Sequence, residues 1–201
     1  MEEWSAMFCR WFLNMPPNRH PLLGTAPVSE HQTGYGHDGI WFIDGIVYNF
    51  TAPIPGLGFR VDTTRTAVVP HGTVFLFALD KIAWDTTGGD PPQDTLLIPS
   101  LLSTVQNRKD TLNQIVSADI DGAPVSNIDG YWTTPTLSSI TVADSNLYPP
   151  GPPSYAGRTF RIAHAGIYLF IDGLSSGNHT FHVRKTSQKE LTNIYYRITV
   201  Q

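Results

Sequence analysis

The stretch Phe59-Arg-Val-Asp-Thr-Thr-Arg-Thr-Ala-Val-Val69 alternates in the manner of a β-strand that is buried on one face. Pro70-His-Gly72 follows as a turn, and Thr73-Val-Phe-Leu-Phe-Ala-Leu79 is apolar enough for a strand that is buried on both faces. A strand, a turn and a buried strand in succession predict a protein that is built from packed sheets.

Further strand signals recur about every ten residues, without long helical segments between them. Apolar runs flank Asp44-Gly45 and Asp121-Gly122, so residues 39–50 and 115–126 each predict a hairpin. Other strand-like stretches are residues 136–143, 158–164, 166–171, 178–184 and 192–200. The pattern predicts one mainly β domain over residues 1–201, either an antiparallel β-sandwich or a jelly roll.

The chain is predicted to open with a short helix over residues 1–15. Its apolar residues recur along one helical stripe, at Trp4, Met7, Phe8, Trp11 and Met15. Pro16-Pro17 ends the pattern, because proline cannot donate a hydrogen bond within a helix. The aromatic stripe is expected to pack either on this chain's own sheet or against another subunit.

A second short helix and two loops are predicted between the strands. The spacing of apolar residues allows a helix near residues 100–113, with Ser100 as its N-cap. Residues 85–95 are rich in Asp, Gly and Pro, which is typical of a loop. Residues 148–155 hold four prolines and are predicted to form a rigid loop rather than an interior strand.

The composition argues against several classes of protein. Hydrophobic residues make up 41% of the 201 positions and charged residues only 15%, so the chain is predicted to be neither disordered nor a coiled coil. The net charge of −4 does not favour nucleic-acid binding. No apolar run approaches the roughly 18 residues of a membrane span, and the acidic start Met1-Glu-Glu3 is unlike an export signal. We expect synthesis in a cytoplasm, and neither nucleic acid nor membrane as a partner.

No group of residues predicts a catalytic centre or a metal site. The single Cys9 lies among bulky apolar residues, which predicts a buried and inert thiol. His179 and His182 are three residues apart, so on a strand they would point to opposite faces and could not bind one ion. Neither the Gly-x-Ser-x-Gly motif of esterases nor a glycine-rich phosphate loop is present.

The acidic residues gather near turns and loops. Asp119 and Asp121 flank a predicted turn, and Asp85, Asp90 and Asp94 lie in one predicted loop. Such clusters are typical of solvated turn residues or weak calcium sites rather than of catalytic carboxylate pairs. The protein is therefore expected not to be an enzyme and to need no cofactor.

Several segments have the form of longer motifs. Trp11-Phe-Leu-Asn-Met-Pro16 with Asn18-Arg-His-Pro21 has the form W-x-x-x-x-P … N-P, and Gly39-Ile-Trp-Phe-Ile-Asp-Gly45 is similar to G-x-V-W-F-L-A-G. With residues 65–77, 165–182 and 195–200, in this order, they resemble an uncharacterised family of exported bacterial and archaeal proteins. The resemblance implies a β-sandwich and no established activity. The family's export signal and paired loop cysteines are missing here, which suggests a member that works in another setting, such as one encoded by a bacteriophage.

The function expected from these features is that of a non-catalytic structural protein. Its most concrete form is a virion accessory subunit that decorates or cements a capsid, binds copies of itself, and is found on a virion or a cell surface after assembly. With only 30 charged residues, apolar area rather than salt bridges would hold the subunits together. The residues expected to make these contacts are Trp4, Phe8, Trp11, Tyr148, Pro149, Pro150 and Tyr155.

The alternative is a carbohydrate-binding module, and a sandwich-fold hydrolase ranks third. Several aromatic residues lie next to predicted turns, where exposed rings could stack on sugars; otherwise they would pack in the core or against loops. They are Trp41, Trp84, Tyr131, Trp132, Tyr148 and Tyr155.

Overall fold

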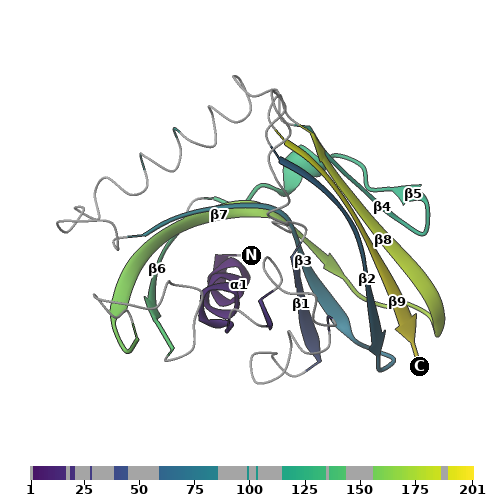
Figure 1. Ribbon diagram of the computed structural model, residues 1–201, viewed down its shortest axis with the longest axis horizontal. Coiled ribbons are helices and arrows are strands. Elements are labelled where there is room, and N and C mark those ends of the chain that lie inside the picture. Colours follow the sequence, from purple (N-terminus) through teal and green to yellow (C-terminus); the bar gives the residue numbers. More distant parts are fainter. Residues whose placement is uncertain are drawn as a thin grey trace.

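The computed structural model describes residues 2–16, 19–20, 28, 39–44, 59–85, 99, 103, 115–134, 136–143, 156–186 and 190–201. In these residues the chain forms nine strands, an N-terminal helix α1 (Glu2–Asn14) and a short 3-10 helix η2 (Ile128–Tyr131) (Figure 1). The strands are β1 (Ile40–Asp44), β2 (Phe59–Val69), β3 (Val74–Asp85), β4 (Ile115–Ile120), β5 (Ala123–Pro124), β6 (Thr136–Thr141), β7 (Thr159–Ile171), β8 (Gly177–Thr186) and β9 (Glu190–Val200).

The strands form two sheets, which confirms the predicted mainly β fold of the sandwich type. One sheet has the strand order β1-β3-β7-β6 and the other has the order β2-β9-β8-β4-β5. Both sheets are mixed rather than purely antiparallel, because β1 runs parallel to β3 and β2 runs parallel to β9. Because β2 and β9 are far apart in the sequence, no tight hairpin joins them and forces them to run antiparallel.

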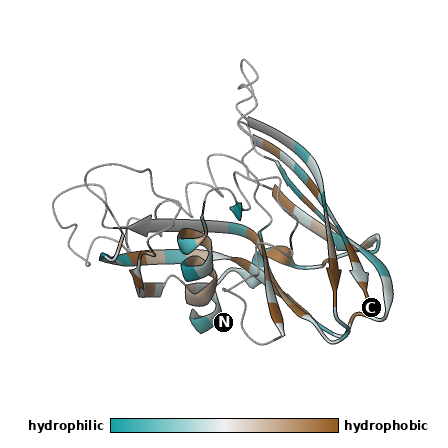
Figure 2. Cartoon of the chain, turned by 60° about the horizontal axis from the view of Figure 1, so that its bottom comes forward, coloured by the Kyte–Doolittle hydropathy of each residue, from teal (hydrophilic) through white to brown (hydrophobic). Residues whose placement is uncertain are grey.

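The core between the sheets is formed by alternate residues of the facing strands. Figure 2 shows hydrophobic and hydrophilic residues alternating along the strands of the five-stranded sheet. The buried apolar residues of β9 are Ile194, Tyr196, Ile198 and Val200. Phe75 and Phe77 of β3 meet Phe181 of β8 edge to face, with ring centroids 5.4 and 5.9 Å apart. The alternation that predicted the strands therefore also defines the core.

Helix α1 covers the other face of the four-stranded sheet and lies in the hollow of the bent strand β7 (Figure 1). Phe8 and Trp11 are 0% and 2% exposed, and both rings contact Phe42 of β1. The side chain of Asn14 fixes the end of the helix to β6, because its Nδ2 donates to the Thr141 carbonyl 3.2 Å away. Of the two expected surfaces for the aromatic stripe, the helix therefore packs on the chain's own sheet.

Residues 158–164 and 166–171, predicted as separate stretches, form the single strand β7. Gly166 does not interrupt it, and the place needs a residue without a side chain. A Cβ atom there would lie 2.6 Å from the carbonyl oxygen of Asp80 and 2.7 Å from the Tyr168 ring. On the partner strand β3 the register shifts between Ala78 and Asp80. Gly166 thus allows the strands to stay paired beside this irregularity.

The remaining predictions divide between confirmed elements and undescribed segments. The hairpin at Asp121-Gly122 is confirmed by the pairing of β4 with β5. Of the predicted loop at residues 85–95, Asp85 instead ends strand β3, and the rest lies outside the described residues. The run at 46–50, the loop at 148–155 and, apart from residue 103, the predicted helix at 100–113 also lie outside them. None of the helices in the described part of the chain is long and apolar enough to cross a membrane.

Candidate binding cleft

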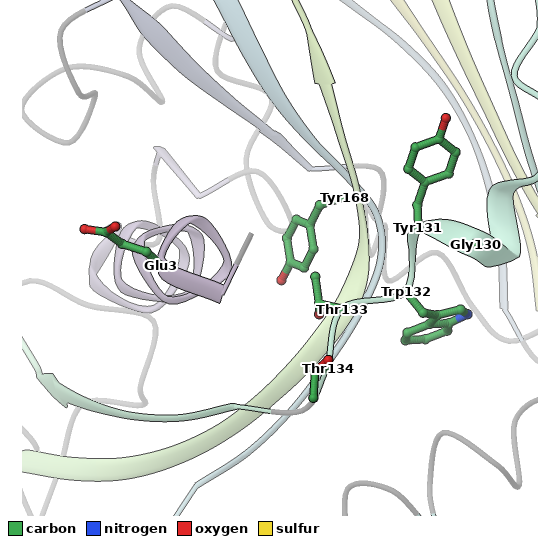
Figure 3. Close-up of a pocket in the computed structure, with 7 residues that line it drawn as sticks. All are labelled: Glu3, Gly130, Tyr131, Trp132, Thr133, Thr134 and Tyr168. Atoms are coloured by element: carbon green, nitrogen blue, oxygen red, sulfur yellow. The ribbon is translucent and has the colours of Figure 1, made fainter.

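A cleft of about 490 Å³ opens between the first turn of α1 and the segment that follows η2 (Figure 3). The residues that line it come from α1, η2, the segment after η2 and β7. They are Glu3, Gly130, Tyr131, Trp132, Thr133, Thr134 and Tyr168. Its size is that of small-molecule binding sites, which usually measure about 300–1,000 Å³.

One wall of the cleft is fixed to β7 by the backbone. Trp132 forms a β-bridge with Ile167. The amide of Thr133 donates to the Gly166 carbonyl at 2.8 Å, and the Gly166 amide donates to the Thr133 hydroxyl at 3.0 Å. The wall begins at Asn127, which has left-handed backbone geometry with φ 53°. This segment is therefore held in place before any ligand arrives.

Tyr168 lies at the inner end of the cleft, where its side chain projects from β7 on the side of α1 (Figure 3). The residue is 0% exposed, and its hydroxyl lies beside the Cys9 thiol, a weak hydrogen-bonding group; no contact with hydrogen-bond geometry joins the hydroxyl to the described residues. Burial, and to a smaller degree Cys9, Asp44 and Asp80, raise the pKa of the phenol well above its usual value. The hydroxyl therefore remains protonated and can act as a donor to a group that reaches this buried position.

Exposed aromatic rings occur on the lining of the cleft and on the elements that form it. Tyr131 is 43% exposed, whereas Trp132 packs against the core between the sheets. Phe170 is 40% exposed and meets Trp4 edge to face, with ring centroids 5.3 Å apart. Trp4 follows Glu3 in α1 and Phe170 lies two residues beyond Tyr168 on β7, so this pair is close in sequence to residues of the cleft but is not part of its lining. We call Trp4, Tyr131 and Phe170 the aromatic rim.

The residues that were expected to contact other subunits lie in different parts of the molecule. Trp4 belongs to the aromatic rim, but Phe8 and Trp11 are buried under α1. Their interpretation as contact residues is corrected, because the sheet of the same chain already covers them. Cys9 is buried as predicted. The remaining four, Tyr148, Pro149, Pro150 and Tyr155, lie outside the described residues.

Apart from the cleft, a network of polar side chains crosses the outer face of the five-stranded sheet. Asp119, His182, Asn193 and Asp62 form a chain of hydrogen bonds over four neighbouring strands, with distances of 2.8, 2.6 and 3.2 Å. The ring of Tyr195 stacks on His182 at a centroid distance of 4.1 Å. We call these five residues the polar ladder. Its polar groups are matched to one another, as in a network that stabilises the sheet.

His179 forms a separate contact at the β4–β5 turn, so the two histidines point apart as predicted. Its Nδ1 lies 2.7 Å from a carboxylate oxygen of Asp121, and its Nε2 lies 2.9 Å from the Ser175 carbonyl. These two hydrogen bonds raise the pKa of His179. Burial raises the pKa of Asp121, but the hydrogen bonds from His179 and from the Thr180 amide outweigh it, so the net shift is downward.

The described residues show no metal centre. No three His, Cys, Asp or Glu side chains among them gather closely enough to hold an ion. Asp119 and Asp121 bind His182 and His179 instead. Asp90 and Asp94 lie outside the described residues, so the interpretation of their loop as a weak calcium site stays a prediction.

Comparison with protein-family models, with curated proteins and with solved structures finds no match for this chain. The resemblance noted from the sequence motifs stays a prediction.

Proposed function

We propose that this chain is a non-catalytic binding protein whose cleft takes a neutral, hydroxyl-rich ligand of the carbohydrate class. The observation that carries the proposal is the buried Tyr168 hydroxyl without a described partner at the inner end of the cleft. A buried polar group that is left unpaired costs about 1–3 kcal/mol. A ligand hydroxyl that displaces part of the lining and accepts from the buried Tyr168 hydroxyl would remove this cost.

The rest of the cleft supports a sugar-like ligand. A pyranose ring offers an apolar face for Tyr131 and the other rings of the aromatic rim, and its hydroxyl groups can donate to the exposed carboxylate of Glu3. Thr134 adds a further hydroxyl at the exposed side. The combination of exposed rings and a few polar groups is typical of small-molecule sites.

The same residues argue against the hydrolase alternative. Hydrolysis of a glycosidic bond usually needs two carboxyl groups on opposite sides of the bond. Glu3 is the only carboxylic acid among the described residues that line the cleft, and the raised pKa of Tyr168 keeps its hydroxyl protonated, so it cannot take up a proton as a base. The arrangement can therefore bind and orient a ligand, but it lacks an acid–base pair.

The test is an array of neutral and acidic glycans, followed by calorimetric titration of the glycan that binds best. Tyr168→Phe removes only the hydroxyl, and we expect it to weaken binding about tenfold, the loss of one hydrogen bond. The variant should fold with unchanged or higher stability, because it removes an unpaired buried group. Tyr195→Phe on the polar ladder is the matched control and should bind normally. Failure of every glycan to bind, or equal binding by Tyr168→Phe, would contradict the proposal.

A second candidate function is assembly, as a virion accessory subunit that contacts copies of itself or a larger lattice. The aromatic rim favours it, since Tyr, Trp and Phe are enriched in the centres of protein interfaces. The expected result is an oligomer in light scattering that persists in high salt and with a chelator, and that dissociates in Phe170→Ser. A monomer under all conditions would contradict this candidate and leave the carbohydrate proposal standing.

A further inference from the structure

Lys185 and Asp80 form an ion pair between the two sheets, out of contact with solvent. Lys185 lies on β8 and is 1% exposed, and Asp80 lies on β3 and is 0% exposed. The Lys185 Nζ is 3.1 Å from Oδ1 of Asp80. Thr192 of β9, which pairs with Lys185 in register, is also buried. An amine and a carboxyl group are thus held together inside the core.

The irregularity in β3 directs Asp80 toward this partner. Ala78 belongs to the cluster under α1, so without a register shift Asp80, two residues later, would face α1 as well. The shift between Ala78 and Asp80 instead lets the carboxyl group meet Lys185 of the opposite sheet. Gly166 allows the close approach of the Asp80 backbone. The register shift in β3 and the glycine at position 166 therefore both allow the contact between Asp80 and Lys185.

Stability alone does not account for such a pair. Apolar residues of similar volume often replace a buried ion pair with no loss of stability, because removing two charges from water is costly. Two groups held in contact are, in contrast, the starting arrangement that intramolecular reactions need; here the 3.1 Å distance joins Nζ to Oδ1, and the reacting carbon Cγ is the atom bonded to that oxygen. The pair therefore fits a chemical role better than a purely stabilising one.

We propose that Lys185 and Asp80 are the two halves of a covalent cross-link, an amide bond between Nζ and the Asp80 side-chain carbon Cγ. A proton first passes from the ammonium group to the carboxylate along the existing hydrogen bond, which gives a neutral amine and a neutral acid. The amine lone pair then adds to Cγ. The tetrahedral intermediate expels one carboxyl oxygen as water, which takes one proton from the acid and one from the nitrogen. The reaction needs no oxidant, reductant or other reactant.

The core favours this condensation, which is unfavourable between free groups in water. The charged pair carries a large desolvation penalty, whereas a neutral amide is much less costly to bury. The released water can leave the core for the solvent. The product would join β3 to β8, residues that lie 105 positions apart in the sequence, and would stop the two sheets from separating. The inference does not depend on the function of the cleft.

The test is the intact mass of the purified full-length protein, measured after prolonged incubation at physiological temperature. The expected mass is lower than that of the sequence by one water molecule, and protease digestion should give a branched peptide that joins Lys185 to Asp80. In Asp80→Asn the same attack would release ammonia instead of water, so the mass should fall by one ammonia molecule.

Lys185→Met is the decisive control, because it keeps a long apolar side chain and removes the amine. An Asp-Gly sequence such as Asp121-Gly122 can also lose water, by forming a succinimide, but that loss would persist in Lys185→Met. A full sequence mass in the wild-type protein, or a loss of water that survives in Lys185→Met, would overturn the cross-link. If Lys185→Met fails to fold, the presence or absence of the branched wild-type peptide decides the question.

Discussion

The outer faces of the two sheets differ in chemistry: one is apolar and covered by a helix, and the other carries hydrogen-bonded polar side chains. On the four-stranded sheet, aromatic and aliphatic side chains lie under α1, and Phe42, Leu76 and Tyr168 are each at most 1% exposed. On the five-stranded sheet, the corresponding outward positions hold the polar ladder. Alternation along a strand therefore fixes only which residues share a face. The chemistry of those residues decides whether the face is covered or is stabilised by its own hydrogen bonds.

Two histidines show how the surroundings of an imidazole ring set its pKa. His164 lies on the face of β7 that α1 covers, together with Ile162 and Tyr168. It is 0% exposed, and burial lowers its pKa to about 4. His179 stands at the turn beside the five-stranded sheet, where Asp121 raises its pKa. Burial under α1 thus disfavours a charge on His164, whereas the Asp121 carboxylate at the turn favours a charge on His179.

Removal of Trp11 from the covered face should have the largest effect. Trp11→Ala deletes a buried ring that contacts Phe42, and we expect a loss of about 3–5 kcal/mol in the free energy of unfolding. Denaturation with urea measures it. Thr66→Ala, on the exposed outer side of β2, is the control and should change stability by less than about 0.5 kcal/mol. A loss below about 1 kcal/mol for Trp11→Ala would mean that α1 is only loosely docked.

Acidification should destabilise the covered face through His164. In the unfolded chain its pKa is about 6.5, and in the folded chain about 4, so between these values the unfolded state binds more protons. Stability is therefore lost as the pH falls from 7 to 4, by about 3 kcal/mol for this residue. The hydrogen bond between Nε2 and the Ser138 hydroxyl, at 2.8 Å, can persist with a neutral ring.

The contribution of His164 is isolated by comparison with His164→Gln, which cannot titrate. The difference in unfolding free energy between the wild-type protein and His164→Gln should shrink as the pH falls toward 4. A difference that stays constant over this range would show that His164 is not held in its neutral form by burial.

The sequence predicted the layered β fold and the apolar stripe of α1, because these depend on local periodicity. It did not predict the parallel pairing of β2 with β9, which depends on contacts between residues far apart in the chain. It also divided residues 158–171 into two stretches, whereas pairing with β3 and β6 joins them into the single strand β7. The fold was therefore predictable where local pattern decides it.

The candidate sites were predictable only in part. Tyr131 was identified because it lies next to a turn, and its ring is exposed. Tyr168 stands in a continuous apolar run, and the lack of a described partner for its hydroxyl depends on how α1 and the segment after η2 close around it. The burial of Lys185 was predictable from the sequence, because it falls in the same alternating row as the core residues Phe181 and Val183.

The smallest expected effect concerns the contact between His179 and Asp121. Asp121→Asn removes the carboxylate charge while asparagine tolerates the left-handed backbone at this position, where φ is 52°. The pKa of His179 should then fall toward its usual value of about 6.5, which an NMR titration of the imidazole measures. Because the folded pKa is raised, the contact stabilises the protein below about pH 6.5, and this contribution is lost as the pH rises through the folded value. Asp121 is 46% exposed, so we expect a change of less than about 1 kcal/mol in stability.

Asp129→Asn removes the same charge from an exposed position in η2 and should leave the His179 titration unchanged. An unaltered His179 titration in Asp121→Asn would show that the Ser175 carbonyl alone holds the proton, and the contrast with His164 would then rest on burial and not on the carboxylate.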